Sequence, residues 1–355
     1  MKKVTVNTSK KYNILLGSGL IEDIETHLAR VTDVCKICVV SDGNVNDLYG
    51  KKLRTSLESA GHDVCVFAFE AGEKSKNMTT VSKLLEFMAE KQLTRTDIIV
   101  AFGGGVVGDI AGFAASCYLR GIRFIQIPTT LLAAVDSSVG GKTGVNITAG
   151  KNLVGAFWQP SLVLCDHGLF KSLKHETLLE GIAEVIKYGV IADEELFDLM
   201  ARACVSELFN DNLFEHIIEK CVKIKSEIVS RDERDMGERQ LLNFGHTLGH
   251  AIEKCSNYEI SHGHAVAIGM LCISRAAYEF GLSPKSCYVK IEQALKQHGF
   301  VLTCDYSAEE LYEAALIDKK RTGNFITLIL PDKIGSCRLE KVDITLFREF
   351  VRKGI

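Results

Sequence analysis

The stretch Ile98-Ile-Val-Ala-Phe-Gly-Gly-Gly-Val-Val-Gly-Asp109 joins a short apolar run to a glycine turn and then to a helical pattern. Apolar, β-branched residues at 98–102 are typical of a buried strand. The glycines let the backbone approach a pyrophosphate at the N-terminus of the following helix. Tight packing of a strand on a helix also uses glycine, and the spacing differs from the usual G-x-G-x-x-G pattern. Both interpretations therefore stay open.

Similar strand-like runs surround this stretch, and helical patterns separate them. The runs are Cys35–Asp42, Asp63–Phe69, Asp97–Phe102, Phe124–Ile127 and Leu162–Cys165, with helical patterns at Val45–Ser59 and Met78–Lys91. This alternation predicts an α/β N-terminal domain with a doubly wound, mostly parallel, Rossmann-like sheet. Asp42 closes the first strand, where it can hold a ribose hydroxyl or, with Asn44, form a turn or a helix N-cap.

The pattern of hydrophobic residues changes after about residue 174. Helical periodicity with few strand signals runs through Glu176–Phe209, Asn212–Val229, Leu241–Cys255, Gly263–Phe280 and Pro284–His298. The sequence therefore predicts an all-helical C-terminal domain over 175–355, beside an α/β domain over 1–174. Near the end, Asn324–Leu330 and Ser336–Leu339 predict a small hairpin before a last helix. A cleft between the two domains is the expected place for a site.

Composition excludes several classes of protein. The net charge of −3 and the scattered basic residues predict no nucleic-acid partner. No stretch reaches the roughly 18 apolar residues of a membrane span, and no signal peptide opens the chain, so we expect a soluble, cytoplasmic protein. The 12 cysteines lie mostly in apolar runs, which indicates reduced core thiols. Cys35 and Cys38 have C-x-x-C spacing, but a strand points them to opposite faces.

Four histidines, His246, His250, His262 and His264, fall within 19 residues. The first two are spaced i, i+4 and so share one face of a helix, which favours a divalent-metal site. A lone histidine is more often a core or interface residue, and it is the cluster as a whole that favours the metal. Glu184 lies in another helical pattern among small and apolar residues, where a carboxylate needs a lysine or a metal as partner. An ordinary surface ion pair is the alternative.

The segment Gly140-Gly-Lys-Thr143 is not a P-loop, because Asp136 and Ser137 stand where the first glycine is required. Lys142 and a second lysine, Lys151, are expected to project from flexible, glycine-rich loops. We interpret them as cations for a small anionic substrate, with a solvated surface position as the alternative.

Taken together, these segments closely resemble the 3-dehydroquinate synthase family over about residues 35–322. The shared motifs are Gly72-Glu-Lys-Ser-Lys76, Gly103-Gly-Gly-Val-Val-Gly-Asp109, Arg120-Gly, Pro128-Thr-Thr, Asp136-Ser-Ser-Val-Gly-Gly-Lys-Thr-Gly-Val-Asn146, Gly150-Lys-Asn152, Ala183-Glu-Val-Ile-Lys187, Asn243-Phe-Gly-His-Thr-Leu-Gly-His250, His262-Gly and Asp318-Lys-Lys320. The resemblance implies a shikimate-pathway lyase that converts 3-deoxy-D-arabino-heptulosonate 7-phosphate to 3-dehydroquinate and phosphate. It also implies transient oxidation by NAD, phosphate elimination, re-reduction and an internal aldol closure.

The same resemblance implies the cofactors and the site residues. A divalent metal, zinc or alternatively cobalt, would be held by Glu184, His246 and His262. NAD contacts would fall on Asp42, Asn44, Glu73, Lys76, Gly104, Gly105, Val106, Asp109, Thr129 and Thr130, with Lys142 and Lys151 also near the cofactor. Substrate contacts would fall on Arg120, Asp136, Lys142, Lys151, Asn152, Lys187, Lys225, Arg239, Asn243, His250 and Lys320. Lys225 and Arg239 would neutralise the substrate carboxylate, and Arg120 would reach the phosphate in the neighbouring subunit of a homodimer.

Two positions differ from the family's common pattern. His264 stands where glutamate is common and could compete for the metal, and Asp235 is shorter by one methylene than the usual glutamate. The rival enzymes are another sugar-phosphate cyclase and a metal-dependent polyol dehydrogenase. A metal- and nucleotide-binding sensor is the rival that is not an enzyme.

Overall fold

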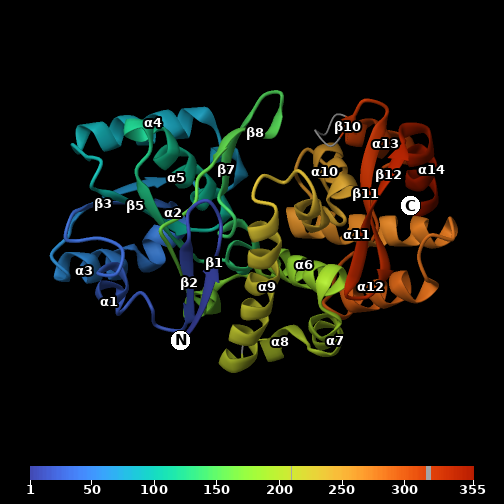
Figure 1. The fold of residues 1–355 in the computed structure, drawn as a ribbon, viewed down its shortest axis with the longest axis horizontal. Helices are drawn as coiled ribbons and strands as arrows, with labels where there is room; N and C mark the ends of the chain where they lie inside the picture. Colours follow the sequence, from blue (N-terminus) through green and yellow to red (C-terminus); the bar gives the residue numbers. More distant parts are fainter. Residues whose placement is uncertain (209, 317–320) are drawn as a thin grey trace. The chain divides into compact units, whose positions relative to one another are not determined.

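The computed structural model describes residues 1–208, 210–316 and 321–355 (Figure 1). The chain forms two compact units. Unit 1 comprises Met1–Leu173 and Lys225–Glu233, and unit 2 comprises Lys174–Ile224 and Arg234–Ile355. The sequence-based boundary between residues 174 and 175 assigned 225–233 to the second domain instead. Among the described helices, none combines the length and the apolar character that crossing a membrane requires.

Unit 1 is built on a seven-stranded sheet with the order β1-β2-β9-β6-β5-β3-β4. The strands are β1 (Lys2–Val6), β2 (Tyr12–Gly17), β9 (Leu162–Asp166), β6 (Arg123–Pro128), β5 (Ile98–Gly103), β3 (Lys36–Asp42) and β4 (Asp63–Phe69). Every neighbouring pair is parallel except β1 and β2. The five predicted strands and the mostly parallel sheet are confirmed. The lysine- and threonine-containing β1 and its partner β2 were not predicted.

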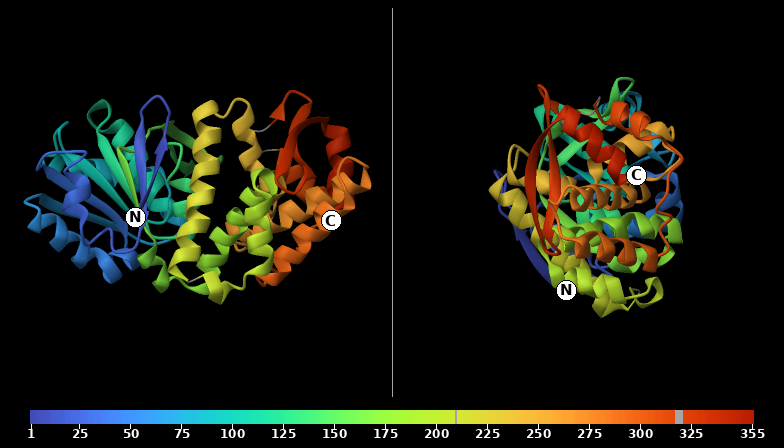
Figure 2. Two further views of the ribbon diagram at one scale, coloured as in Figure 1. Left: turned by 60° about the horizontal axis from the view of Figure 1, so that its bottom comes forward. Right: turned by 90° about the vertical axis from the view of Figure 1, so that its right-hand side faces the viewer.

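The helices of unit 1 are α1 (Ile24–Leu28), α2 (Gly43–Val45), α3 (Lys51–Ser59), α4 (Met78–Glu90) and α5 (Gly105–Cys117), as Figure 2 shows from two further sides. The predicted helix at Val45–Ser59 is interrupted by a π-helical turn, η1 (Asn46–Gly50). Leu84 and Met88 of α4 pack with Ile110 of α5 and with Ile99 and Phe124 of the sheet in one buried cluster. Burial of these apolar side chains holds α4 and α5 on the sheet.

The strand order creates a topological switch point in unit 1. β3 lies between β4 and β5, so the chain leaves β3 towards one edge of the sheet and later returns to its other side. In doubly wound sheets, ligands bind at such a point, beyond the carboxyl ends of the strands. Asp42 ends β3 and Gly103 ends β5. The fold therefore brings two segments that the sequence suggested for a nucleotide to this edge.

The segments carrying Lys142 and Lys151 form a hairpin, so the prediction of flexible loops is wrong. Strands β7 (Lys142–Ile147) and β8 (Gly150–Phe157) pair in antiparallel register, with Gly144 opposite Gly155. A Cβ on Gly155 would lie 2.1 Å from the carbonyl oxygen of Thr143. Glycine is therefore needed here for close approach of two strands.

Unit 2 is largely helical. Its helices are α6 (His175–Ala192), α7 (Glu194–Arg202), α8 (Val205–Leu208), the first part of α9 (Asp211–Arg231), α10 (His246–Cys255), α11 (His262–Glu279), α12 (Lys285–Gln297), α13 (Ala308–Leu316) and α14 (Ile344–Gly354). The predicted helix Glu176–Phe209 is broken at Asp193, whose side chain caps α7 through the N–H of Leu196. Asp193 is a residue type that favours such caps over helix interiors.

Unit 2 also carries an antiparallel sheet of β10 (Arg321–Thr322), β11 (Phe325–Lys333) and β12 (Ser336–Asp343). The predicted hairpin is confirmed by β11 and β12, whereas the description of this domain as all-helical needs this correction.

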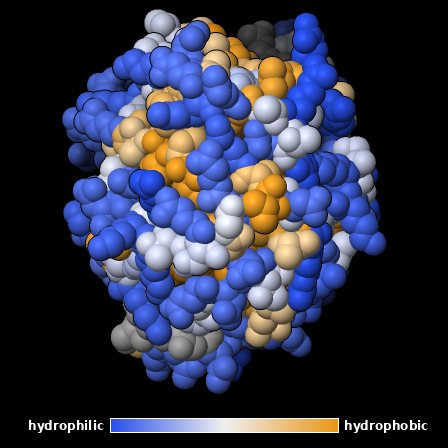
Figure 3. All heavy atoms as spheres, turned by 90° about the vertical axis from the view of Figure 1, so that its left-hand side faces the viewer, coloured by the Kyte–Doolittle hydropathy of each residue, from blue (hydrophilic) through white to orange (hydrophobic). Residues whose placement is uncertain are grey.

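The surface agrees with the composition, and the cysteines agree with it in part. All 12 cysteines are free thiols, but the prediction of core positions holds for only five of them, since six are half-buried and Cys117 is exposed. The face in Figure 3 is mainly hydrophilic, and its hydrophobic residues form separate patches. Such a surface is ordinary for a folded protein in water.

Candidate active site

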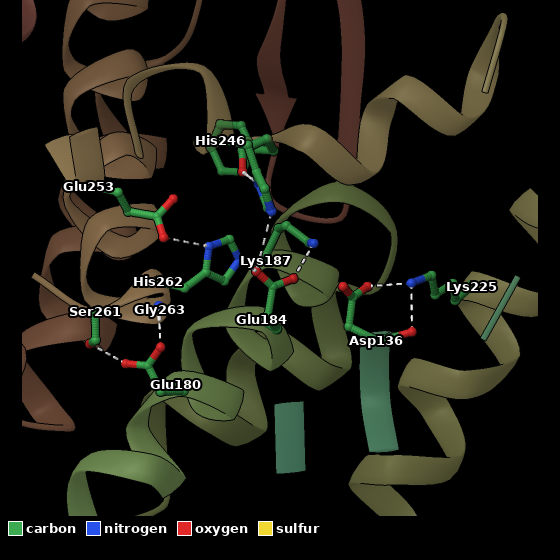
Figure 4. Close-up of polar contacts among 11 residues, drawn as sticks. Asp136, Glu180, Glu184, Lys187, Lys225, His246, Glu253, Ser261, His262 and Gly263 are labelled. Carbon is green, nitrogen blue, oxygen red and sulfur yellow. Dashed lines mark hydrogen bonds and ion pairs between the residues drawn. The ribbon is translucent and has the colours of Figure 1, made fainter. Parts of the chain in front are cut away.

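Glu184, on α6, uses its two carboxylate oxygens differently (Figure 4). Its side chain is completely buried. Oε2 accepts a hydrogen bond from the ammonium of Lys187, one turn further along α6. Oε1 has no hydrogen-bond partner in the described part of the chain and lies 3.5 Å from Nε2 of His246 and 3.7 Å from Nε2 of His262. The sequence left a lysine and a metal as alternative partners of this carboxylate. In the structure the lysine contacts one oxygen, and the other oxygen is positioned to bind a metal.

His246 and His262 are each the first residue of a helix, α10 and α11. Gly245, just before His246, has a φ of 79°, and a Cβ there would lie 2.5 Å from Cγ of Met270. Nδ1 of His246 lies 3.1 Å from the carbonyl oxygen of Phe244. A proton on Nδ1 would be donated to that carbonyl, which leaves the lone pair of Nε2 facing Glu184.

The three donor atoms fit a divalent metal. They lie within 4.8 Å of one another. Ligands on a tetrahedral zinc at about 2.1 Å stand about 3.4 Å apart, whereas an N–H···O hydrogen bond is about 2.9 Å long. The distances of 3.5 and 3.7 Å from Oε1 of Glu184 to the two imidazole nitrogens are closer to the spacing of zinc ligands than to the length of a hydrogen bond. The structure thus brings together the predicted ligand set of Glu184, His246 and His262.

A second group, His250, Glu253 and His262, overlaps the first. Glu253 is buried, and its Oε1 lies 3.5 Å from Nδ1 of His262, on the opposite side of the ring from Glu184. Burial lowers the pKa of His262, but the carboxylates of Glu184 and Glu253 outweigh burial and raise it to about 10. Sequence reasoning missed Glu253. Its position three residues after His250, on the same face of α10, was the available signal.

Glu180, one turn before Glu184 on α6, holds the start of α11. Its Oε2 accepts a hydrogen bond of 2.7 Å from the N–H of Gly263, and its Oε1 accepts one from the hydroxyl of Ser261. A Cβ on Gly263 would lie 2.5 Å from Cα of Glu180, so glycine permits this close approach. Burial raises the pKa of Glu180, but hydrogen bonds from His264, Gly263 and Ser261 outweigh it and lower the pKa overall. Glu180 and Ser261 were not predicted.

His264 faces Glu180 rather than the metal ligands. Its Nδ1 lies 3.1 Å from the hydroxyl oxygen of Ser261 and 3.5 Å from Oε1 of Glu180. Its ring packs against Phe300, with the ring centroids 5.0 Å apart. Among the described residues, neither group of potential metal ligands includes His264. The geometry therefore favours His262 over His264 as the ligand.

At the switch point of unit 1, Asp42 accepts a hydrogen bond of 3.1 Å from the N–H of Val45. This is the helix N-cap that the sequence left open. Gly103 is required by packing, because a Cβ there would lie 2.5 Å from Cγ2 of Val107. α5 then begins at Gly105 without a capping side chain. Such a helix start offers its first N–H groups to an anion.

Thr129 stands beside this glycine turn. Its N–H donates to the carbonyl of Gly103 at 3.0 Å, and its buried hydroxyl has no partner within the described ranges. A buried hydroxyl without a partner calls for a ligand or water. Thr130 is the next residue, and a Cβ on Gly104 would lie 3.3 Å from its Cγ2. The turn, the uncapped helix and the orphaned hydroxyl together fit a dinucleotide.

Lys76 and Asp109 form an ion pair of 2.5 Å at this edge of unit 1, with side chains 7% and 18% exposed. Burial raises the pKa of Asp109, and the ammonium of Lys76 acts against that shift. Two residues predicted to contact NAD thus already contact each other.

The hairpin β7–β8 joins the same neighbourhood through Asn146, which sequence reasoning quoted but gave no role. Its N–H donates to the carbonyl of Lys76 at 2.9 Å, and its side-chain amide donates to Glu73 at 2.8 Å. Lys151 lies 4.0 Å from Glu73, and the N–H of Asn152 donates to the side-chain oxygen of Asn146 at 3.0 Å. Glu73, Lys76, Lys151 and Asn152 are therefore brought together.

Lys225, at the part of α9 that belongs to unit 1, contacts Asp136 (Figure 4). Its ammonium lies 2.6 Å from Oδ1 and 2.7 Å from the carbonyl oxygen of Asp136. Arg239 and Asn243 lie on the 3-10 helix η6 (Glu238–Asn243) of unit 2, where Arg239 is buried. The joint role of Lys225 and Arg239 stays a prediction.

Three further residues were predicted for the site. Arg120 is exposed in a turn, Lys142 is exposed at the start of β7, and Lys320 lies outside the described residues.

Two family models match the chain. The model for the N-terminal part of 3-dehydroquinate synthase covers residues 66–180, and the model for its C-terminal part covers residues 181–321. The 3-dehydroquinate synthase of Clostridium acetobutylicum is 44% identical over 334 residues, 94% of each chain. That of Streptococcus gordonii is 45% identical over 349 residues, 96% of this chain and 97% of the relative.

Solved structures with the same fold include two related cyclases. A 2-deoxy-scyllo-inosose synthase complexed with carbaglucose-6-phosphate, NAD+ and Co2+ has a TM-score of 0.91, 26% identity and full coverage of both chains. ValA, a 2-epi-5-epi-valiolone synthase from Streptomyces hygroscopicus with NAD+ and Zn2+ bound, has a TM-score of 0.88 and 27% identity, and the match covers 98% of this chain and 97% of ValA. A sulfoacetaldehyde reductase at 16% identity, with a TM-score of 0.66, shares the fold alone.

Proposed function

Because this chain belongs to the 3-dehydroquinate synthase family, we propose that it converts 3-deoxy-D-arabino-heptulosonate 7-phosphate to 3-dehydroquinate and phosphate, in the shikimate pathway of the cytoplasm. Identity of 44–45% to 3-dehydroquinate synthases, against 26–27% to the two other cyclases, supports this substrate over theirs. The structural observation that carries the proposal is the buried Oε1 of Glu184 between two imidazoles.

We propose Glu184, His246 and His262 as the ligands of a divalent metal, zinc or cobalt. Lys187 holds Oε2 of Glu184, so only Oε1 is directed between the imidazoles. The carbonyl of Phe244 orients His246, and Glu253 faces the far nitrogen of His262. When bound, the metal would polarise a substrate hydroxyl, and NAD would take up and return the hydride at that carbon.

The switch point of unit 1 is the proposed NAD site. Support comes from the uncapped start of α5 and from the orphaned hydroxyl of Thr129. Gly104, Gly105, Val106 and Thr130 are next to these groups in sequence, and Asp42 and Asn44 lie at the end of β3, the strand that pairs with β5. Glu73, Lys76 and Asp109 are the nearby charged residues, with Lys142 and Lys151 on the hairpin.

For the substrate, we propose that Lys142, Arg120, His250 and Lys320 bind the phosphate and that Lys225 and Arg239 bind the carboxylate. Charge-assisted hydrogen bonds are the strong interactions available to such groups. Lys187 and Asn243 in unit 2, and Asp136 and Asn152 in unit 1, would orient the hydroxyls. Lys225 is held in place by Asp136 before any substrate binds.

Arg120 supports the proposal of a homodimer. Leu119, Arg120 and Gly121 have φ values of 49°, 67° and 120°, so three consecutive residues are in a conformation that side chains rarely adopt. Such strain persists where the surroundings enforce it and often accompanies function. A Cβ on Gly121 would lie 2.5 Å from Cη2 of Trp158, so the turn is packed on that ring. The exposed guanidinium forms no ion pair with the described residues of its own chain.

Complementation tests this trans role. Arg120→Ala and Lys142→Ala are each expected to be inactive. After subunit exchange, mixed dimers would have one intact site and one doubly defective site, so activity should recover to about a quarter of wild type. No recovery despite verified exchange would place Arg120 in the site of its own subunit.

The activity itself is tested with purified protein, NAD, zinc and the heptulosonate phosphate. We expect phosphate and dehydroquinate to form together without net accumulation of NADH. A polyol dehydrogenase would instead accumulate NADH in proportion to substrate. Turnover of a sugar phosphate without a carboxylate, but not of the heptulosonate phosphate, would indicate one of the other cyclases.

A further inference from the structure

Unit 1 contains a pocket at the edge of the sheet opposite to the switch point. Its lining includes Tyr12 at the start of β2, Arg123 at the start of β6 and Leu162 at the start of β9. These three strands are parallel, so their amino ends meet at one edge, whereas Asp42 and Gly103 mark the carboxyl edge. The pocket volume of about 350 Å³ lies within the usual range for small-molecule sites.

The lining is strongly cationic. Five of its side chains are basic, and none of its residues is acidic. The basic residues are Lys3, Lys10, Lys11, Arg30 and Arg123. Within the described ranges, none of these five forms an ion pair with a carboxylate. Burial, together with the nearby charge of Arg123, lowers the pKa of Lys10. A hollow lined by one sign of charge concentrates ions of the opposite sign.

Two of the cations are held by neutral oxygens. Nη1 of Arg123 donates to the carbonyl of Val31 at 2.8 Å, and Nη2 donates to the hydroxyl of Thr32 at 3.1 Å and to the carbonyl of Thr96 at 2.6 Å. The ammonium of Lys10 donates to the hydroxyl of Ser161 at 3.1 Å. These contacts fix both positions without neutralising either charge. Ordered cations without counter-charges favour the binding of an anion, because their side chains lose little further entropy when it binds.

His27, on α1, is a further polar group in this lining. It is only 5% exposed, and its Nδ1 has no hydrogen-bond partner among the described residues. Buried polar atoms in folded proteins nearly always have a partner, including water or a bound ion. The orphaned nitrogen is an observation separate from the charges, and it belongs to a residue that lines the same pocket.

We propose that this pocket binds a small polyanion carrying a phosphoryl group. The planar guanidinium of Arg30 matches the oxygens of a phosphoryl group, and Arg123 and the lysines add charge. The pocket volume of about 350 Å³ is that of a small-molecule site, so the ligand is a small molecule. The pocket lies at the opposite edge of the sheet from the proposed NAD site. Its ligand therefore regulates or stabilises the protein and is not transformed in this pocket.

The experiment is calorimetric titration of the protein, loaded with NAD and zinc, with inorganic pyrophosphate. Lys10→Gln combined with Arg30→Gln removes two charges from the pocket. The matched control is Lys51→Gln combined with Lys83→Gln, which removes two charges from exposed positions on α3 and α4 of the same unit. We expect wild type and control to bind pyrophosphate in this pocket with the same affinity. In the pocket variant the affinity for pyrophosphate should be at least about tenfold weaker, because charged hydrogen bonds are lost.

Turnover and thermal stability without pyrophosphate should be the same in all three proteins. If the pocket variant proves unstable, Lys11→Gln alone takes its place. Titration with orthophosphate and with glycerol 3-phosphate then distinguishes a free phosphate from a phosphorylated metabolite as the ligand. Equal pyrophosphate affinity in the pocket variant and the control would overturn the proposal.

Discussion

The carboxylates among the candidate site residues differ between the two units in how their charge is balanced. In unit 1, Asp109 pairs with Lys76 and Asp136 pairs with Lys225. In unit 2, Glu184 has the ammonium of Lys187 on one oxygen only, and its other oxygen lies between two imidazoles at 3.5 and 3.7 Å. Unit 1 has thus balanced these charges internally, whereas unit 2 retains a position for a cation.

This difference implies two modes of ligand binding. A ligand that contacts Lys76 or Asp109 has to exchange an existing ion pair for a new one. A metal ion that binds Oε1 of Glu184 instead displaces a proton, because the carboxylates of Glu184 and Glu253 raise the pKa of His262 to about 10. Metal binding is therefore expected to be tight and pH-dependent.

The largest effect should follow from removing a metal ligand. Glu184→Gln, His246→Ala and His262→Ala should each weaken metal binding by more than about 100-fold, which exceeds the usual effect of residues that only orient ligands. Activity should be lost with the metal. Metal content after dialysis measures the effect, with His264→Ala as the control that keeps its metal. Stoichiometric zinc in His262→Ala, combined with its loss in His264→Ala, would reverse the ligand assignment.

Breaking the buried ion pair between Glu184 and Lys187 in unit 2 should have the second largest effect. Lys187→Met leaves Glu184 buried with less compensation, so the metal-free protein should lose about 3–5 kcal/mol of unfolding free energy. The control is Lys223→Met, which breaks an ion pair with Glu219 in which the lysine side chain is 55% exposed, and should cost less than about 1 kcal/mol. Urea unfolding in the presence of a chelator gives both values. Similar losses for the two variants would contradict the special position of Glu184.

A smaller loss is expected for Glu253→Gln, because Glu253 orients His262 from its far nitrogen. Metal affinity should fall about 10–100-fold, and competition with a chromophoric chelator measures it. If Glu253→Gln weakened binding as much as Glu184→Gln, the metal would instead occupy the group formed by His250, Glu253 and His262.

The mildest effect concerns pH. In the metal-free protein the pKa of His262 is raised to about 10, so at pH 8 the imidazole is protonated, and the metal must displace that proton. Binding should release about one proton, and affinity should rise with pH until His262 deprotonates near pH 10. Calorimetry in buffers of different ionisation enthalpy counts the protons. No proton release at pH 8 would show that the two carboxylates do not hold His262 protonated.

Local pattern was sufficient to predict the five parallel strands of unit 1, whereas the ligand set of Glu184, His246 and His262 came only from the resemblance to the family. The strand at Asp63–Phe69 was predicted with the bounds that the structure has. The i, i+4 spacing of His246 and His250 placed both on one helical face, and the motif around Glu184 placed its carboxylate among apolar residues. Such features depend on neighbours within a few turns of the chain, which a sequence displays directly.

What the sequence could not provide depends on contacts between distant segments. In the sequence, Gly144 and Gly155 suggested flexible loops. In the structure they lie opposite each other in paired strands, where a side chain would clash with the facing strand. Glu180 reaches Ser261 and Gly263, which lie about 80 residues further along the chain. Lys225 contacts Asp136, which lies 89 residues earlier in the chain. No local period encodes such pairs, because they arise only when the chain has folded.

The most direct test is a crystal structure of the zinc-loaded protein with anomalous diffraction at the zinc edge. The ion should lie about 2.0–2.2 Å from Oε1 of Glu184, Nε2 of His246 and Nε2 of His262, with Oε2 of Glu184 still bonded to Lys187. An ion bound by His264, or by Glu253 with His250 and without Glu184, would contradict this assignment of the site.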